Sequence, residues 1–319
     1  MKINFIVENN RNLRFLGCST IAINLYNTLK RKGVDVHLNS KEKGFDIIHA
    51  HTFGPLALSQ RKKASTSIIS AHSLPSINKG NIVSGGKKFW RKIYRGIYNS
   101  FDYILAVSNT SIDELREIGV NKPIRVLENG VDQRVFRYDR ARGEEFRRKL
   151  GFSEEDFVVL NVAQVTPRKG VYDFIEVASK NPDIRFVWIG GFPYYFISSD
   201  YFKLRELIKN TPSNLVFTGF IDDIVGAYSG ADVLFAPTYG ETFGLTILEA
   251  LSCNLPVLVR PLEVFKELFD EEVLYGSSVE EFSRILRGLP RKRINSSLPD
   301  RYDVDRIVDR LINIYEELI

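Results

Sequence analysis

Cysteine, methionine and tryptophan are scarce in this 319-residue chain, which has two Cys, one Met and two Trp residues. Cys18 and Cys253 lie far apart in sequence, which indicates a reducing compartment and no cysteine-based metal site. Long apolar runs are also missing. The apolar runs that are present are far shorter than the ~20 residues of a membrane-spanning helix. The chain opens on the strand-like run Ile3–Val7 without a basic and apolar leader, so we expect no signal peptide.

Charge is distributed unevenly, although the net charge is only +5. Residues 1–130 hold 20 of the 44 Lys and Arg residues but 9 of the 39 Asp and Glu residues. The first part of the chain is therefore strongly basic and the remainder mildly acidic. A basic surface indicates an anionic partner, which can be a nucleic acid, an anionic membrane or a phosphorylated ligand. Charge alone does not choose among these three.

Hydrophobic patterning predicts strands that alternate with helices in both halves of the chain. Apolar runs such as Tyr103–Val107 and Phe157–Val162 are typical of strands that are buried on both faces. The segment Ser19–Arg31 has apolar residues at helical spacing, and Gly33 follows as a stop signal. This alternation predicts an α/β fold with parallel sheets covered by helices. Such sheets bind ligands at the carboxyl ends of their strands.

The most informative segment is Ala236–Ala250, which contains two carboxylates, Glu241 and Glu249, eight residues apart. A strand ends at Pro237, and a polar turn with glycine leads into a helix. The N–H groups at the start of this helix belong to Phe243, Gly244 and Leu245. Free N–H groups and the positive end of the helix dipole suit a phosphate. The alternative is an ordinary strand–turn–helix with a capping and a solvated Glu.

A second segment, Asn161–Gly170, follows a buried strand and precedes another helix. It carries two adjacent cations, Arg168 and Lys169, at the end of the strand. A planar guanidinium beside a mobile ammonium suits a diphosphate. Taken alone, this segment would more often be a solvated basic turn. Its position at a strand end of the acidic half favours the binding interpretation.

Together, these segments resemble the retaining glycosyltransferases of family 4, whose hallmark is two glutamates separated by seven residues, here Glu241 and Glu249. Shorter matches follow in order along the chain: His49–His51, Ala71–Ser73, Ala106–Ser108, Glu128–Asp132, Pro167–Gly170 and Phe217–Gly219. The resemblance implies the GT-B fold, in which two Rossmann-like, doubly wound domains face each other across a cleft. Within the family, three segments are similar to the membrane-associated diacylglycerol glycosyltransferases: His51–Pro55, Gln164–Phe174 and Phe186–Phe192.

The resemblance also implies a domain organisation. We expect a basic, acceptor-side Rossmann-like domain over residues 1–135 and a sugar-nucleotide-binding Rossmann-like domain over residues 136–300. The boundary falls in the charged stretch Asp132–Lys149. Residues 301–319 should form a C-terminal helix that can pack back on the first domain. Within this part, the pair Asp303 and Asp305 precedes the helix and is interpreted as a cap or surface pair.

The resemblance assigns roles to single residues. The catalytic residues would be Glu241, Lys169 and His72. Donor binding would involve Gly17, Gln164, Arg168, Lys169, Glu241, Phe243, Gly244, Leu245 and Glu249. Arg168 and Lys169 would hold the diphosphate, and Glu249 would accept hydrogen bonds from the ribose. The nucleotide sugar is a co-substrate, and neither a cofactor nor a metal ion is expected; a glycosidase-type carboxylate pair is not assigned.

The chain departs from the family pattern at three places. Ala163-Gln164 stands where many members have Gly-Arg, which removes one expected phosphate cation. Arg260–Leu262 replaces the usual Gly-Gly, and the glycine-rich first loop is reduced to Gly17. The resemblance to the diacylglycerol glycosyltransferases implies that Gln is accepted at the first position, so we interpret it as variation.

The segment Gly86–Tyr98 predicts a basic helix with two apolar edges. One edge consists of Phe89, Ile93 and Ile97, and the other of Trp90, Tyr94 and Tyr98. Such a helix is typical of a membrane surface, but it can equally pack its apolar stripe on the sheet. The two interpretations are compatible if the edge with Trp90 stays exposed. The membrane or acceptor residues would be Lys87, Lys88, Trp90, Arg91, Tyr94 and Arg95.

We therefore expect a hexosyltransferase that uses a nucleotide sugar, which the subfamily resemblance indicates to be UDP-hexose, and a membrane lipid acceptor such as a glycosyldiacylglycerol. It would be peripheral on the cytoplasmic face of an anionic cell membrane. A soluble or polyprenyl-linked glycan acceptor is an alternative, and so is a nucleotide-sugar sensor without turnover. A nucleic-acid-binding protein is the alternative of another class, but the chain has no RNP, KH or helix-turn-helix signature. The run Arg61–Lys63 is interpreted as a solvated loop, and His49 and His51 are not expected to bind metal.

Overall fold

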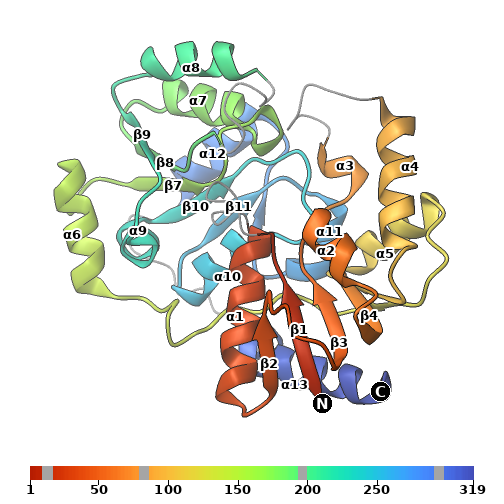
Figure 1. Cartoon of the computed structure of the whole chain (residues 1–319). Helices are drawn as coiled ribbons and strands as arrows, with labels where there is room; N and C mark the ends of the chain where they lie inside the picture. Colours follow the sequence, from red (N-terminus) through yellow and green to blue (C-terminus); the bar gives the residue numbers. More distant parts are fainter. Residues whose placement is uncertain (9–16, 79–85, 193–199, 291–297) are drawn as a thin grey trace. The chain divides into compact units, whose positions relative to one another are not determined.

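The computed structural model describes residues 1–8, 17–78, 86–192, 200–290 and 298–319. The chain divides into two compact units, which are described separately (Figure 1). Unit 1 comprises Met1–Ser76, Ser84–Asp132 and Pro299–Ile319. Unit 2 comprises Ile77–Val83 and Gln133–Leu298.

Unit 1 contains a six-stranded sheet in which every neighbouring pair of strands is parallel. Its strands are β1 (Lys2–Ile6), β2 (Asp35–Leu38), β3 (Phe45–Ala50), β4 (Ala64–Ala71), β5 (Tyr103–Ala106) and β6 (Ile124–Val126), in the spatial order β2-β1-β3-β4-β5-β6. All four residues of β5 are buried. Because successive side chains of a strand point to opposite faces, this sheet is covered on both sides around β5.

The helices of unit 1 follow from local signals. They are α1 (Gly17–Arg31), α2 (Pro55–Gln60), α3 (Pro75–Asn78), α4 (Lys87–Tyr98), α5 (Asn109–Glu117) and α13 (Val304–Glu317). The side chain of Ser108 accepts a hydrogen bond from the N–H of Ser111 and so caps α5. Gly33 follows α1 with φ of +79°, as a stop signal requires.

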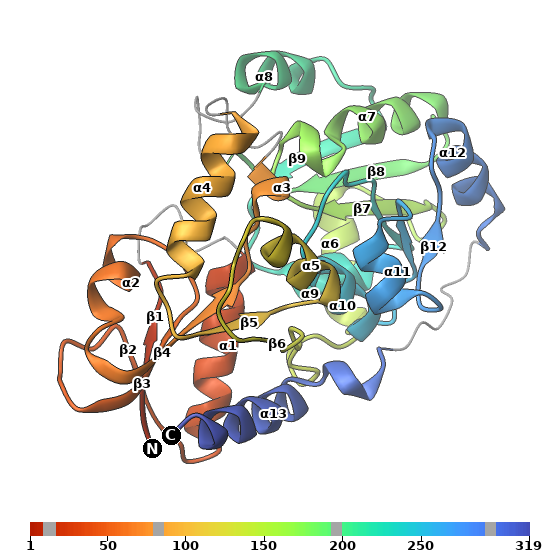
Figure 2. The same ribbon diagram turned by 90° about the vertical axis from the view of Figure 1, so that its right-hand side faces the viewer.

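The C-terminal helix α13 packs beside α1 in unit 1 (Figures 1 and 2). The Tyr315 hydroxyl lies 2.5 Å from Nδ1 of His49, which belongs to β3. Arg31 of α1 forms an ion pair with Asp305 at 2.7 Å. The Asp303 side chain accepts a hydrogen bond from the N–H of Asp305, so the prediction of a cap at this position is confirmed.

Unit 2 contains a second six-stranded parallel sheet. Its strands are β7 (Val158–Val162), β8 (Arg185–Ile189), β9 (Leu215–Gly219), β10 (Val233–Ala236), β11 (Val257–Val259) and β12 (Leu274–Tyr275), in the order β12-β11-β10-β7-β8-β9. Its helices are α6 (Arg140–Leu150), α7 (Val171–Lys180), α8 (Tyr201–Lys209), α9 (Ile224–Gly230), α10 (Leu245–Ser252), α11 (Glu263–Phe269) and α12 (Val279–Gly288). Short 3₁₀ turns occur at Pro167–Lys169 in this unit and at Asp300–Tyr302 in unit 1.

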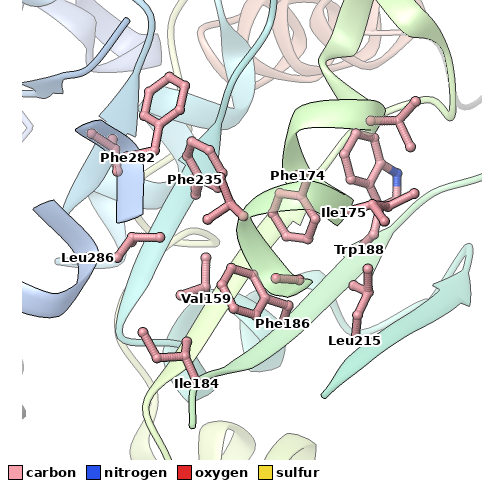
Figure 3. Close-up of a cluster of buried hydrophobic side chains, with 14 of the residues drawn as sticks. Val159, Phe174, Ile175, Ile184, Phe186, Trp188, Leu215, Phe235, Phe282 and Leu286 are labelled. Atoms are coloured by element: carbon pink, nitrogen blue, oxygen red, sulfur yellow. The ribbon is translucent and has the colours of Figure 1, made fainter. Parts of the chain in front are cut away.

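An aromatic core lies between the sheet of unit 2 and its helices α7 and α12 (Figure 3). The ring of Phe174 is within 5.5 Å of the rings of Phe186, Trp188 and Phe235, measured between centroids. The indole N–H of Trp188 donates to the carbonyl of Ala163 at 3.0 Å. The core thereby holds the backbone just beyond the carboxyl end of β7, where the predicted site begins.

The two sheets agree with the α/β fold that the alternation of strands and helices predicts. None of the helices in the described part of the chain combines the length and hydrophobicity that a membrane span requires.

Candidate functional site

The two segments that carry the predicted donor site meet at the carboxyl ends of β7 and β10. The N–H of Tyr239 donates to the carbonyl of Arg168 at 2.7 Å, and the hydroxyl of Thr238 donates to the same oxygen at 3.1 Å. Gly170 has φ of +75°, and a Cβ atom there would lie 2.2 Å from the carbonyl oxygen of Pro237. Only glycine permits this close approach of the two loops.

Charged side chains from the two segments are paired with each other. The Lys169 ammonium forms an ion pair with the Glu241 carboxylate, and Arg168 Nη1 lies 3.8 Å from the same carboxylate. Arg168 also donates to the carbonyl of Gly240. The side chains of Arg168, Lys169 and Glu241 are only 7%, 18% and 16% exposed. Two cations therefore share one anion in a partly dry environment and leave a local positive excess.

The environment of Glu241 keeps its carboxylate ionised. Burial by itself raises the pKa of Glu241, but the positive charges of Lys169 and Arg168 outweigh it, and the net shift of the pKa is downward. Burial lowers the pKa of the Lys169 ammonium, and Glu241 opposes that effect. In the ligand-free protein, the Lys169 ammonium is therefore paired with the glutamate of the same predicted site.

Helix α10 begins at Leu245, after a glycine with unusual backbone geometry. Gly244 has φ of +104°, and a Cβ atom there would lie 2.9 Å from Ile247 Cδ1 and 3.0 Å from Phe265 Cε1. The Phe243 side chain is 2% exposed and its ring packs on that of Phe269. Phe243 therefore anchors the turn through its side chain, and only its backbone is suited to contact a ligand.

A small polar cavity lies beside the ion pair. It has a volume of about 10 Å³, roughly the space that one water molecule needs. Among its lining residues are Lys169, Glu241 and Gly244, together with Asn161, Thr238 and Thr246. Asn161 is 1% exposed, and its Nδ2 atom has no hydrogen-bond acceptor among the described residues. Three of the residues predicted for donor binding, Lys169, Glu241 and Gly244, thus line a cavity that also contains the buried donor group of Asn161.

Glu249 lies on α10 and binds Tyr228 of α9. The Tyr228 hydroxyl donates to Oε2 of Glu249 at 2.7 Å. Burial raises the pKa of Glu249 to about 7, and the hydrogen bond from Tyr228 opposes this shift. Glu249 is not among the residues that line the small cavity, and neither is Gln164. Its ribose-binding role and the donor role of Gln164 stay predictions.

Arg260 links several segments around the site, although the sequence marked it only as a departure from the family pattern. It forms an ion pair with Asp173 of α7 at 2.5 Å and donates to the carbonyl of Pro237 at 3.1 Å. Its guanidinium lies 4.1 Å from the centroid of the Tyr239 ring. Arg260 therefore holds the loop that carries Glu241.

Tyr228, Asn161 and Thr246 were missed by the sequence analysis as site residues. Asn161 does carry a signal, since it is the single polar residue in the run Val158–Val162. Tyr228 carries none, because it is 21 residues from Glu249 and its neighbours resemble those of any buried helix.

Two of the residues predicted for catalysis or donor binding belong to unit 1. Gly17 is the first residue of α1, and the loop before it lies outside the described residues. His72 follows β4, and its Nε2 atom lies 3.4 Å from Nδ1 of His51. Burial lowers the pKa of His72 to about 4, so its imidazole is neutral near pH 7. Its catalytic role stays a prediction.

His49 lies in β3 and His51 directly follows this strand, and both side chains are buried. Within the described ranges, no group of three or more His, Cys, Asp or Glu residues is arranged to hold a metal ion.

The predicted membrane edge of α4 requires a correction. Tyr94 and Tyr98 are 1% and 0% exposed, so the edge formed with Trp90 packs inward and does not stay at the surface. Their hydroxyl groups form hydrogen bonds with Ser73, which stabilises the tyrosine edge, rather than the edge with Phe89, in the buried position. The exposed residue of the opposite edge is Phe89, at 57%.

The cations of α4 differ in their surroundings. Arg91 is paired with Glu117 at 2.8 Å, whereas Lys88 and Arg95 are exposed. Lys87 is the first residue of the helix, and its side chain lies outside the described part of the structure.

Comparisons with known proteins agree with the residue pattern. The model named Glycosyltransferase Family 4 matches residues 38–135, and the model named Glycosyl transferases group 1 matches residues 143–288. A processive diacylglycerol alpha-glucosyltransferase of Acholeplasma laidlawii is 28% identical over 91% of this chain and 90% of its own length. An alpha-galactosylglucosyldiacylglycerol synthase of Streptococcus pneumoniae is 28% identical over 85% of this chain and 77% of its own length.

Solved structures share the fold. The Anabaena protein HepE, determined with UDP and glucose, has a TM-score of 0.79 at 18% identity and covers 99% of this chain and 100% of its own. Sucrose-phosphate synthase of Thermosynechococcus elongatus has a TM-score of 0.79 at 16% identity, with 100% and 99% coverage. The predicted GT-B fold, with one parallel sheet in each unit, is confirmed. Because the matches extend over both units, this protein is a glycosyltransferase that belongs to glycosyltransferase family 4.

Proposed function

We propose that this enzyme transfers a hexose from UDP-hexose to a membrane lipid of the diacylglycerol or glycosyldiacylglycerol class, with retention of configuration. The observation that carries the proposal is the meeting of Arg168, Lys169 and Glu241 at the carboxyl ends of β7 and β10, beside the start of α10. The names of the two diacylglycerol glycosyltransferase relatives support the acceptor class. The UDP and glucose bound to HepE support the donor class.

The chemistry needs charge stabilisation more than acid–base catalysis. The bond between the sugar C1 atom and the β-phosphate oxygen breaks, while an acceptor hydroxyl oxygen bonds to C1 from the same face. The proton of that hydroxyl passes to the leaving phosphate. Lys169 would leave Glu241 to bind the diphosphate, and Arg168 would share the growing negative charge. Glu241, released from the lysine, would accept hydrogen bonds from sugar hydroxyls.

No cofactor or resident metal ion is part of this proposal, because protein cations supply the positive charge. His72 of unit 1 is assigned to the reacting centre by the family resemblance, in its neutral form. Gly17, Gln164 and Glu249 keep the donor-binding roles that the resemblance implies.

The acceptor lipid would be reached from the membrane surface. The proposal places the enzyme as a peripheral protein on the cytoplasmic face, with α4 toward an anionic leaflet. The exposed Phe89 and the exposed cations Lys88 and Lys92 support this assignment.

Radiolabelled UDP-sugars offered to the enzyme with a membrane lipid extract test the proposal. We expect label in the lipid phase, and we expect Lys169→Ala and Glu241→Ala to reduce transfer about 10²-fold or more, as the loss of a preorganised charge does. Lys266→Ala is the matched control, because Lys266 pairs with Glu263 at 2.9 Å on the surface of the same unit.

The pattern of transfer separates the alternatives. Label that appears only in soluble or polyprenyl-linked glycans would overturn the acceptor class but not the enzyme. Full transfer by Lys169→Ala or Glu241→Ala would overturn the role of that residue. Binding of a UDP-sugar without transfer to any acceptor would indicate a sensor instead.

A further inference from the structure

Helix α4 is fastened to unit 1 through its edge with Tyr94 and Tyr98 and through the ion pair of Arg91 with Glu117. The Tyr94 hydroxyl lies 2.9 Å from the Ser73 hydroxyl, and the Tyr98 hydroxyl donates to the Ser73 carbonyl at 2.5 Å. Both rings are buried. The edge with Phe89, Ile93 and Ile97 is turned away from these contacts, which leaves an apolar strip of the helix near solvent.

That strip forms one wall of a groove between α4 and α2, which are neighbours in unit 1 (Figure 2). The groove has a volume of about 560 Å³, within the range of small-molecule sites. Its apolar lining comes from Leu58 of α2 and from Phe89, Ile93 and Ile97 of α4. Gly96 adds open space, because a Cβ atom there would meet nothing within 4 Å.

Cations stand at the rim of this groove. Lys92 lines it, is exposed, and forms no ion pair with any residue that the structure describes. Arg61 also lines it, and its Nη1 atom donates to the carbonyl of Leu58 while its Nε atom is buried without a partner in the described ranges. Arg61 lies in the turn after α2, in agreement with the predicted loop, but it is half-buried, whereas Lys62 and Lys63 are exposed. No Asp or Glu is among the described residues that line the groove.

We propose that this groove binds one acyl chain of an anionic bilayer lipid, whose phosphate meets Lys92 and Arg61. The inference rests on the proposed function in that it needs the enzyme to work at a membrane. An apolar channel with a cationic rim matches a ligand that has an apolar chain and an anionic head. The guanidinium of Arg61, which lines the groove, belongs to the kind of group that forms charge-assisted hydrogen bonds with a phosphate.

The rim charge argues against a second copy of the chain as the occupant, because two basic surfaces repel each other. It also distinguishes the bound lipid from a neutral glycolipid acceptor. The site would hold the enzyme on the leaflet through a lipid that it does not modify.

Dodecyl phosphate below its micelle concentration is the probe, with binding to the full chain measured by calorimetry. We expect one chain per protein, and affinity at least tenfold weaker in Gly96→Leu, whose side chain enters the groove. Leucine is a better helix former than glycine, so this variant should fold. Gly288→Leu is the matched control, because Gly288 is also helical and open but lies on α12 of unit 2. Its affinity should stay within twofold of the wild type.

A second variant and a second ligand test the head group. Lys92→Glu should weaken dodecyl phosphate binding at least fivefold, and dodecylphosphocholine should bind at least fivefold more weakly than dodecyl phosphate. Equal affinity for the two ligands, unchanged binding by Gly96→Leu, or dimerisation through this face without lipid would each overturn the proposal.

The transfer assay with wild-type enzyme separates this proposal from the proposed function. Groove-dependent binding without sugar transfer would support the lipid site and reject the function. Transfer without any binding of dodecyl phosphate would reject the lipid site alone.

Discussion

The ammonium of Lys169 and the carboxylate of Glu241 form an ion pair that joins the turn after β7 to the loop after β10. Neither side chain is more than 18% exposed. Arg168 approaches the same carboxylate at 3.8 Å. The two opposite charges thus neutralise each other in a partly dry site. A donor diphosphate would have to displace Glu241 in order to bind Lys169.

We expect that substitutions at Lys169 and at Glu241 have strongly coupled effects on the free energy of unfolding. Lys169→Met or Glu241→Gln alone should lower the free energy of unfolding by about 2 kcal/mol, because each leaves a charge poorly compensated. The double variant should cost less than the sum of the two, with a coupling energy of about 1–3 kcal/mol. Urea unfolding of the four proteins measures this. The exposed pair Lys266 and Glu263 should show a coupling below about 0.5 kcal/mol in the same cycle. Additive effects at Lys169 and Glu241 would contradict the buried pairing.

Donor binding should depend on pH through Glu249. The pKa of Glu249 in the donor-free protein is raised to about 7 by burial. If ribose hydroxyls donate to this carboxyl group, the donor binds the ionised form better, so the dissociation constant should fall as pH rises through about 7. Below that pH the proton must be lost on binding, and affinity should weaken by up to about tenfold per pH unit. Calorimetric titration with UDP between pH 5.5 and 8.5 measures the dependence. Glu249→Gln should flatten it, and an unchanged profile in that variant would remove Glu249 from donor recognition.

Arg260 should act as a positioning residue for the loop that carries Glu241. Removing its guanidinium in Arg260→Ala breaks the ion pair with Asp173 and the hydrogen bonds to Pro237 and Ser277. We expect a loss of about 2–3 kcal/mol in the free energy of unfolding, since charge-assisted hydrogen bonds to partly buried groups are lost. The KM for the UDP-sugar should rise more than kcat falls, because the loop would no longer be held in its binding geometry.

Arg260→Lys should not restore the donor KM, because an ammonium cannot reproduce the fork of contacts. Arg284→Ala is the control, since Arg284 is 77% exposed and pairs with Glu281 only at 3.5 Å. Stability loss with an unchanged KM would limit Arg260 to a structural role.

Unit 1 should lose stability in mild acid because of its buried histidines. Burial lowers the pKa of His49 from 6.5 to about 3. His49 therefore takes up a proton near pH 6.5 in the unfolded chain but stays neutral in the folded chain. The contribution of neutral His49 to the free energy of unfolding is fully present above about pH 6.5 and declines as the pH falls below that value. For His49 alone, the loss between pH 7.5 and pH 5 should be about 2 kcal/mol. Urea unfolding at both pH values should show a smaller difference in His49→Gln, and an equal difference would contradict the assignment.

The sequence predicted the two parallel sheets and the meeting of the two segments that carry the predicted donor site. Apolar strand runs alternate with amphipathic helices, and this periodicity needs no tertiary information. The turn after β7 and the loop after β10 could be predicted to meet, because parallel strands place their carboxyl ends on one edge of a sheet. The cap at Asp303 could also be predicted, since the bonded groups of Asp303 and Asp305 are two residues apart.

Partners that lie far apart in sequence could not be predicted. The hydrogen bond between Tyr228 and Glu249 and the contacts of Arg260 with Asp173 join different helices and loops. No periodicity or spacing encodes such pairs, because they depend on how elements pack in three dimensions.

Helix α4 shows most clearly which features the sequence determines and which only the tertiary structure decides. Its sequence determined that two apolar edges exist, one with Phe89 and one with Tyr94, and that cations separate them. Hydrophobic spacing is the same for both edges and cannot rank them. The tertiary structure decided that Tyr94 and Tyr98 point inward, because their hydroxyl groups find partners at Ser73. A phenylalanine has no such group to satisfy, so Phe89 was left at the surface beside the groove.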